Sequence, residues 1–242
     1  MKSGSGRTAS VFALSALLLA SLGSPAEANN PRNPQVVFNG ASLQTYLNGV
    51  GQTINVATDQ FDIPCWSTTV SNNATFTIQL ELTGNPAGNA VGVYNCSDGP
   101  APTLYEIFPG VASQGWFAVA SFNVGGPGNL VVNVFNNSAV LVSNTAYAGV
   151  DASNFGFYLA SSFGGPVAVY YSQDARNFGG DPQALVYAGT GTSAGQWWLA
   201  FEDEAFSISD KDFDDFVMFM ESVNKPVPAI QTTWGGLKVR LN

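Results

Sequence analysis

Short segments with alternating apolar and polar residues fill most of the chain, and this period restricts the chain to β-structure. In the clearest segment, ATFTIQLEL (74–82), every second side chain from Phe76 to Leu82 is apolar. Similar segments occur at 36–38, 53–57, 90–95, 116–122, 129–135, 155–161, 167–172, 184–189, 196–202 and 216–221. Gly-Pro, Asn-Pro, Asp-Gly and Gly-Gly pairs separate them and favour turns. Two packed antiparallel sheets bury such faces, so we expect an all-β, jelly-roll-like antiparallel β-sandwich.

One segment, SLQTYLNGV (42–50), has a helical pattern instead. Leu43 and Leu47 are four residues apart, and Ser42 is placed to cap the first turn. The fold is therefore expected to contain at most one short helix.

The two ends of the chain differ from its centre. Residues 1–28 have a basic start, an apolar run and an Ala-Glu-Ala site, which is the pattern of a cleaved secretion signal. Residues 223–242 have a Pro-spaced linker followed by LKVRLN, in which apolar and basic residues alternate. We expect a signal peptide at 1–28, a sandwich domain at 29–222, and a linker with a terminal strand at 223–242. That strand is either a frayed tail or an addition to a sheet edge of its own or a neighbouring copy.

The charge of the chain limits its partners. The formal net charge is −9 and there is no histidine. A basic surface for nucleic acid is therefore absent, and a cation is the more plausible charged partner. Histidine-based catalytic triads and most metallohydrolase sites are also excluded. No segment after residue 28 is apolar and long enough to span a bilayer.

Cys65 and Cys96 are the only cysteines. They fit a disulfide formed in an oxidising compartment, and the alternative is two buried free thiols. Three sequons, at Asn73, Asn95 and Asn136, leave glycosylation open.

The segment FEDEAFSISDKDFDDF (201–216) gathers much of the acidic charge of the chain. Its carboxylates are Glu202, Asp203, Glu204, Asp210, Asp212, Asp214 and Asp215. The flanking segments read as two strands, and if they pair as a hairpin these carboxylates converge on one rim of the sandwich. Mutual repulsion then favours a hard cation, and calcium accepts six to eight oxygen ligands. We expect a Ca²⁺ site formed by Glu202, Asp203, Asp210, Asp212, Asp214 and Asp215.

The acidic segment has three other interpretations. An EF-hand is excluded, because its sixth position requires glycine and holds Asp215. A solvated acidic hairpin stays open. A glycoside hydrolase with Glu202 and Asp212 as its carboxylate pair stays open as the least favoured alternative.

The neighbouring tryptophans offer a different kind of site. Trp197 and Trp198 are adjacent in a predicted strand, so their side chains lie on opposite faces. An exposed Trp198 could stack on sugars, as in carbohydrate-binding sandwiches, whereas the ordinary alternative is packing in the core.

Residues 150–222 resemble a bacterial domain of unknown function numbered forty-one fourteen. The resemblance is carried by "GFYL", "YYS…N" and the closing motif "FEDEAFSISDKDFDDFVMFM". It implies an exported bacterial protein whose acidic residues, here Glu202, Asp203, Asp210, Asp212, Asp214 and Asp215, bind calcium or act in an enzyme. Many proteins of this kind end in a PEP-CTERM sorting tail, which residues 226–242 do not match.

Together these observations predict an exported calcium-binding protein with a structural or adhesive role at the bacterial cell surface or in extracellular matrix. The alternatives are a glycan-binding module and a subunit that self-assembles through its C-terminal strand.

Overall fold

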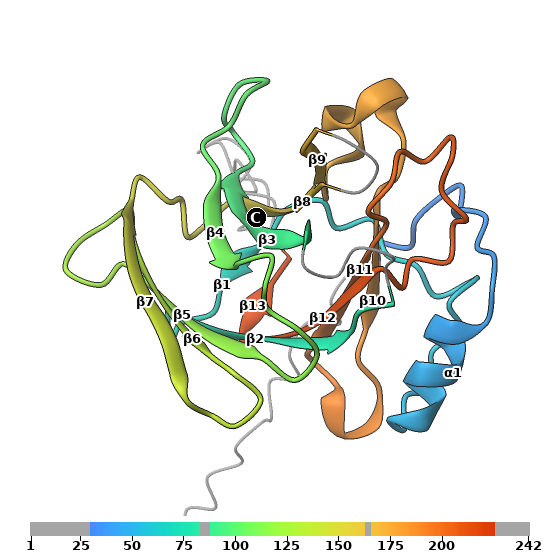
Figure 1. The fold of residues 1–242 in the computed structure, drawn as a ribbon, viewed down its shortest axis with the longest axis horizontal. Helices are drawn as coiled ribbons and strands as arrows, with labels where there is room; N and C mark the ends of the chain where they lie inside the picture. The colour runs from blue at the N-terminus through green and yellow to red at the C-terminus, as the bar shows by residue number, and fades with distance from the viewer. Residues whose placement is uncertain (1–29, 83–87, 163–165, 226–242) are drawn as a thin grey trace, which may run out of the picture.

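The computed structural model describes residues 30–82, 88–162 and 166–225 and shows two layers of antiparallel strands (Figure 1). The larger sheet has seven strands. In spatial order they are β10 (Ala184–Ala188), β11 (Trp197–Phe201), β12 (Phe216–Glu221), β2 (Asn73–Leu80), β5 (Phe117–Phe122), β6 (Asn129–Phe135) and β7 (Leu141–Ala148). The smaller sheet contains β4 (Tyr105–Phe108), β3 (Ala90–Asn95), β8 (Phe155–Ser161) and β9 (Ala168–Tyr171).

A short pair of strands, β1 (Ser67–Thr68) and β13 (Val223–Asn224), completes the β-structure. All paired neighbours are antiparallel. The predicted all-β sandwich is therefore confirmed. Because Val223 and Asn224 pair with β1, the β-structure continues two residues past the predicted boundary at 222.

The main core lies between the two sheets and is rich in aromatic rings. Phe157 on β8 contacts both Trp66 and Phe76 edge to face, with ring centroids 6.2 and 5.5 Å apart. Trp66 also meets Trp197 of β11 at 5.3 Å. These rings come from both sheets, so the alternation seen in the sequence is what fills the space between the layers.

A second core lies on the outer face of the larger sheet, under helix α1 (Ser42–Gly49) (Figure 1). Leu43 and Leu47 of the helix are fully buried in this core, together with Trp198 and Phe213. The single predicted helix is thus confirmed, although Ser42 makes no capping hydrogen bond.

Trp197 and Trp198 do lie on opposite faces, one in each core. The prediction that Trp198 is exposed for stacking on sugars is nevertheless wrong. The side chain is 4% exposed, because α1 covers this face and Tyr46 packs edge to face on the indole.

Two predicted strands, 36–38 and 53–57, do not form. Glutamine side chains take the place of a strand partner in both segments. The Gln60 amide accepts a hydrogen bond from Val36 N and donates one to Val36 O. Gln44 likewise accepts from Val56 N and donates to Ile54 O. The apolar side chains of both segments still enter the second core. The alternating pattern therefore predicted their burial correctly but wrongly predicted that they pair in a sheet.

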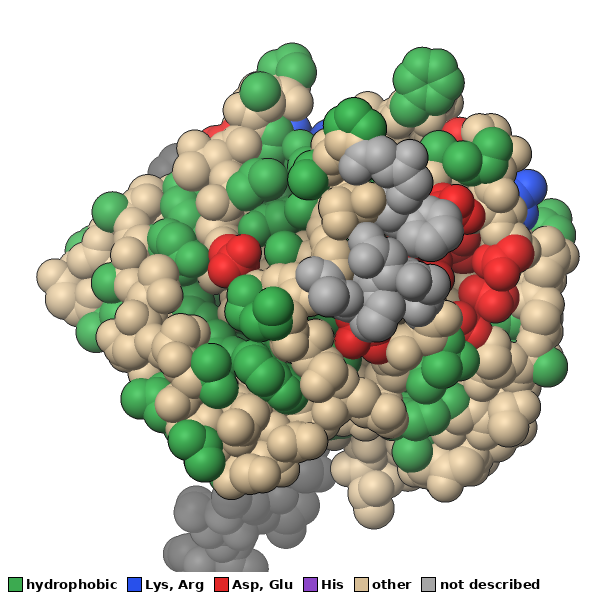
Figure 2. Space-filling view, in the orientation of Figure 1, with side chains coloured by type: hydrophobic (Ala, Val, Ile, Leu, Met, Phe, Trp, Pro, Cys, Tyr) green, Lys and Arg blue, Asp and Glu red, His purple; other side chains and the backbone are tan. Residues whose placement is uncertain are grey.

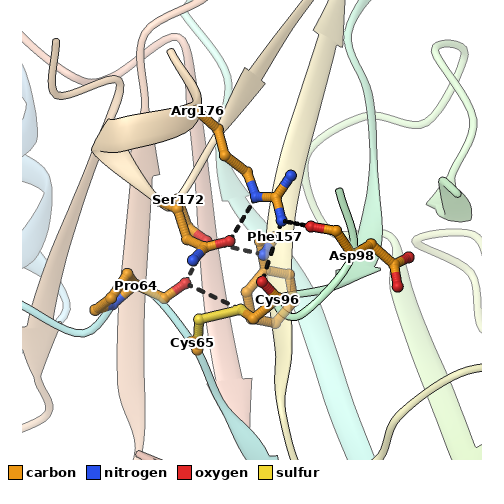
Figure 3. Close-up of a disulfide and its surroundings, with 8 residues drawn as sticks. Pro64, Cys65, Cys96, Asp98, Phe157, Ser172 and Arg176 are labelled. Atoms are coloured by element: carbon orange, nitrogen blue, oxygen red, sulfur yellow. Dashed lines mark hydrogen bonds between the residues drawn. A yellow bond between two sulfur atoms is a disulfide. The ribbon is translucent and has the colours of Figure 1, made fainter. Parts of the chain in front are cut away.

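Cys65 and Cys96 form a disulfide, which confirms the predicted pair (Figure 3). It joins the segment before β1 to the end of β3, with 6.3 Å between the two Cα atoms. Arg176 holds the same corner, since its guanidinium donates to the carbonyls of Cys96 and Asp98 and lies 5.0 Å from the centre of the Tyr94 ring.

Of the three sequons, Asn95 is buried. Its amide donates to Gly149 O at 2.8 Å and accepts from Asp151 N at 2.7 Å. The folded chain therefore does not present Asn95 for glycosylation.

The predicted signal peptide at 1–28 lies outside the described residues, as does the part of the tail after residue 225. Among the described residues, no helix has the length and apolarity that crossing a membrane requires.

Replacing both cysteines with serine should lower the free energy of unfolding by roughly 3–4 kcal/mol, because the disulfide closes a loop across a sequence separation of 31 residues. Urea denaturation followed by tryptophan fluorescence measures this loss. An unchanged midpoint in the double variant would show that the disulfide contributes nothing to stability.

Candidate metal centre

The predicted acidic hairpin is present. Strands β11 and β12 pair from Trp197↔Met220 to Phe201↔Phe216, so residues 202–215 form the connection at one end of the sheet. Asp and Glu side chains gather on the β10–β12 side of the molecule (Figure 2). The hairpin thus brings together carboxylates that the sequence already places within a few residues of one another.

Three carboxylates form the centre of this group. Oxygen atoms of Glu202, Asp210 and Asp212 all lie within 4.8 Å of one another. Glu202 is fully buried, Asp212 is half-buried and Asp210 is exposed. Because burial decreases from Glu202 outward, the group is open to solvent on one side only.

Glu202 is the deepest member and is only partly satisfied. Its Oε1 accepts a hydrogen bond of 2.6 Å from Phe213 N. Its Oε2 is buried and makes no hydrogen bond of normal geometry among the described residues, although the nearby Ser209 hydroxyl lowers the pKa of this carboxyl. A buried carboxylate oxygen without a partner is costly, so this atom requires a ligand or a proton.

The loop reaches this geometry through left-handed turns rather than through strand alternation. Lys211 and Phe213, which flank Asp212, have φ angles of 65° and 49°. Strand alternation does not position Asp210, Asp212 and Asp214, because residues 210–215 precede β12 and are not extended in a sheet.

Lys211 is the basic residue nearest to the carboxylates in the sequence, and its charge is directed elsewhere. Its ammonium lies 4.5 Å from the centre of the Phe206 ring. No ion pair of Glu202, Asp210 or Asp212 is found among the described residues. The described part of the chain therefore forms no ion pair with the three carboxylates.

The segment before α1 closes one side of the group. Asn39 donates from its backbone to Lys211 O and from its side chain to Asp210 O, both at 2.9 Å. Gly40 adopts φ 78°, and a Cβ there would come within 3.0 Å of the Asp212 Cβ. Glycine at this position allows the backbone to lie directly against Asp212.

Asp214 faces α1, where the Ser42 hydroxyl donates to its Oδ2. Ser42 is the first residue of the helix, so its hydroxyl serves this carboxylate rather than the helix cap. The helix N-terminus also presents positive partial charge to the carboxylate.

Asp203 and Asp215 form a neighbouring group. The Asp203 backbone N–H donates to Asp215 Oδ2, and the Asn89 amide donates to Asp203 Oδ2, both at 2.9 Å. Glu81, which directly follows β2, adds a further carboxylate beside Asp203. The sequence reasoning missed Asn39, Asn89 and Glu81, because only strand pairing and the fold around α1 bring them to the hairpin.

The carboxyl groups raise one another's pKa values. Burial, and then the charge of Asp212, raise the pKa of Asp214 to about 7. Burial, with Asp203 and Glu202 nearby, raises the pKa of Asp215 to about 8. Burial also raises the pKa of Glu202. Each shift has the same meaning: without a counter-charge, the folded site holds protons that an unfolded chain would release.

The site is therefore a set of carboxylate oxygens arranged in depth, in which Glu202, Asp210 and Asp212 have no ion pair among the described residues. Carboxylate oxygens are the ligands of hard divalent cations. Of the six predicted calcium ligands, the structure brings Glu202, Asp210 and Asp212 into one set, places Asp214 beside it, and places Asp203 and Asp215 in the adjoining group.

Comparisons with known proteins add no assignment to this geometry. No model of a known protein family matches the chain, and no curated protein matches it either. The resemblance of residues 150–222 to the domain of unknown function stays a prediction.

Stability without metal should fall as the pH rises. Because the folded-state pKa values of Asp214 and Asp215 lie above the unfolded value near 4, their contribution is fully present below about pH 4 and is lost as the pH passes about 7 to 8. Thermal melts in chelator between about pH 5 and pH 9 should show this decline.

Asp215→Asn keeps the shape of the side chain and removes its titration, so we expect a shallower decline in this variant. The exposed Asp62→Asn is the matched control and should follow the wild-type curve. A metal-free melting temperature that rises across this pH range would contradict the assignment.

Proposed function

We propose that the protein is an exported β-sandwich that binds one Ca²⁺ ion at Glu202, Asp210 and Asp212, and that the ion serves a structural or adhesive role outside the bacterial cell. The observation that carries the proposal is the buried Oε2 of Glu202, which makes no hydrogen bond of normal geometry, in a set of three carboxylates with no ion pair among the described residues.

Calcium suits this arrangement better than magnesium does. It accepts six to eight oxygens at irregular angles, whereas Mg²⁺ requires near-ideal octahedral geometry. Three carboxylates at different depths, with the exposed Asp210 leaving room for water, form an irregular shell. Asp214 is close enough to contribute charge, since the charge of Asp212 helps to raise the pKa of Asp214 to about 7.

A cation at this site would stabilise the position of the loop that carries the carboxylates. The three carboxylates belong to the β11–β12 connection, and the Asn39–Ser42 segment is bonded to the same connection. Neutralising the carboxylates would hold both segments together. A site of about 10⁻⁴ M affinity, typical of extracellular modules, would gain roughly 1.4 kcal/mol at millimolar calcium.

Export to an oxidising compartment has its own support. The chain begins with the pattern of a secretion signal, and its two cysteines form a disulfide.

Glycan binding and glycoside hydrolysis have weaker support than calcium binding. Stacking of sugars on Trp198 is not available, since that ring is buried. Hydrolysis by Glu202 and Asp212 would require a sugar to reach Glu202, which has no exposed surface.

Calcium at about 1 mM should raise the melting temperature by roughly 3–6 °C, and chelator should reverse the rise. Glu202→Gln should have two opposite effects. It removes a buried charge, so metal-free stability should rise at pH 8, and it removes a ligand, so the calcium shift should be lost. Thermal melts with and without calcium measure both effects.

Asp212→Asn should lose the calcium shift as well, whereas Asp62→Asn should keep it. Native mass spectrometry of the wild type should show one added calcium ion. The proposal fails if the melts ignore calcium and no bound metal is detected.

A further inference from the structure

The seven-stranded sheet has one covered edge, at β10, and one open edge, at β7. At the β10 edge, Phe61 N donates to Val186 O at 2.9 Å, and the Tyr187 hydroxyl donates to Val56 O. Residues 56–61 therefore cover that edge. At the other edge, β7 pairs with β6 on one side and with no described strand on the other (Figure 1).

β7 lacks most of the devices that normally protect an open edge. Its one irregularity is a register shift near Leu141, where Val134 pairs with Ser143 but Phe135 pairs with Leu141. Its sequence, LVSNTAYA, has no charged residue and no proline. Leu141 and Val142 are 52% and 47% exposed. Natural proteins usually blunt such edges with lysine, proline or a covering loop, because the free backbone groups pair with other strands. The regularly paired part of this edge, residues 143–148, is a surface for adding a strand.

The edge is also held in place by the rest of the fold. The Tyr147 hydroxyl donates to Glu106 O at 2.9 Å, and the Tyr147 ring lies 5.7 Å from that of Tyr105 on the other sheet. Its pairing with β6 is regular from Asn129↔Ala148 to Val134↔Ser143. Most of the strand is therefore ordered for pairing before a partner arrives.

The charge distribution identifies the partner. Residues 107–150, which include β5, β6 and β7, contain no charged side chain, although the chain as a whole carries −9. The strands β5–β7 themselves offer no complementary charge to a basic or acidic partner, and one carboxylate of the other sheet, Glu106 on β4, lies beside Tyr147 of β7. Two copies of this chain, however, repel each other least when they approach along β5–β7, with their acidic hairpins on the far side (Figures 1 and 2).

We propose that β7 pairs antiparallel with β7 of a second copy, which joins the two larger sheets into one. Around the two-fold axis, residues lie opposite themselves or their near neighbours, so a charge there would meet its own copy. A register that keeps both smaller sheets on the same side pairs residues whose numbers sum to an even number, such as Thr145 with Thr145 and Asn144 with Ala146. All three of these residues are neutral.

The test is self-association of the full chain, measured by sedimentation velocity over a concentration series. Asn144→Lys/Ala146→Lys places four lysines at the paired edges of a dimer and should weaken association by about tenfold or more. Asn137→Lys/Ser138→Lys adds the same charge in the exposed β6–β7 turn and should associate like the wild type. Thermal melts check that both variants fold.

The series is run in calcium and in chelator, and dimers in both would separate this inference from the proposed cation site. Added salt should strengthen association, because it screens the repulsion between two negative chains. A wild type that stays monomeric throughout, or a β7 variant that dimerises normally, overturns the proposal. A chain truncated after Lys225 should still dimerise. If the truncated chain is monomeric, the C-terminal segment and not β7 forms the contact, and the proposal is overturned.

Discussion

Burial of β11 on both faces is the constraint on which the acidic site depends. Leu199 packs between the two sheets, while Trp198 and Ala200 pack under α1. Because side chains alternate along a strand, the next residue on the α1 face is Glu202, which enters the second core with no exposed surface. A carboxylate in that place is expensive unless something balances it. The hairpin, its loop and the start of α1 each place hydrogen-bond donors beside this carboxylate or its neighbours.

These donors satisfy single carboxylate oxygens but do not neutralise the charge. The Phe213 N–H satisfies one oxygen of Glu202, and the Ser42 hydroxyl satisfies one oxygen of Asp214. Neither is a full counter-charge, and the one lysine in the hairpin lies over an aromatic ring. Protons or a divalent cation can complete the balance, and the two compete for the same oxygens. Because burial and the charge of Asp212 raise the pKa of the neighbouring Asp214 to about 7, calcium binding at the proposed set should be linked to proton release near neutral pH.

The sequence predicted features that depend on local period, and missed those that depend on distant partners. Strand β12 was predicted with its observed bounds, and the carboxylates of the hairpin follow from its pairing with β11. The segments 36–38 and 53–57 have the same alternation, but Gln60 and Gln44 satisfy their backbone groups, which no periodicity indicates. β7 was missed for the opposite reason. Its serine, asparagine, threonine and alanines give little apolar contrast, and its pairing with β6 makes it a strand.

Charge is distributed unevenly between the two ends of the larger sheet. The β10–β12 end is covered on both faces and concentrates carboxylates, while the β5–β7 end is open and has none. A cation at the first end lowers the net charge of each copy, and lower net charge weakens repulsion between copies at the second end. Calcium could then favour association without touching the interface. The coupling would be small at physiological ionic strength, because the Debye length is about 8 Å. Extracellular calcium would therefore act chiefly on the stability of each subunit, and only secondarily on assembly.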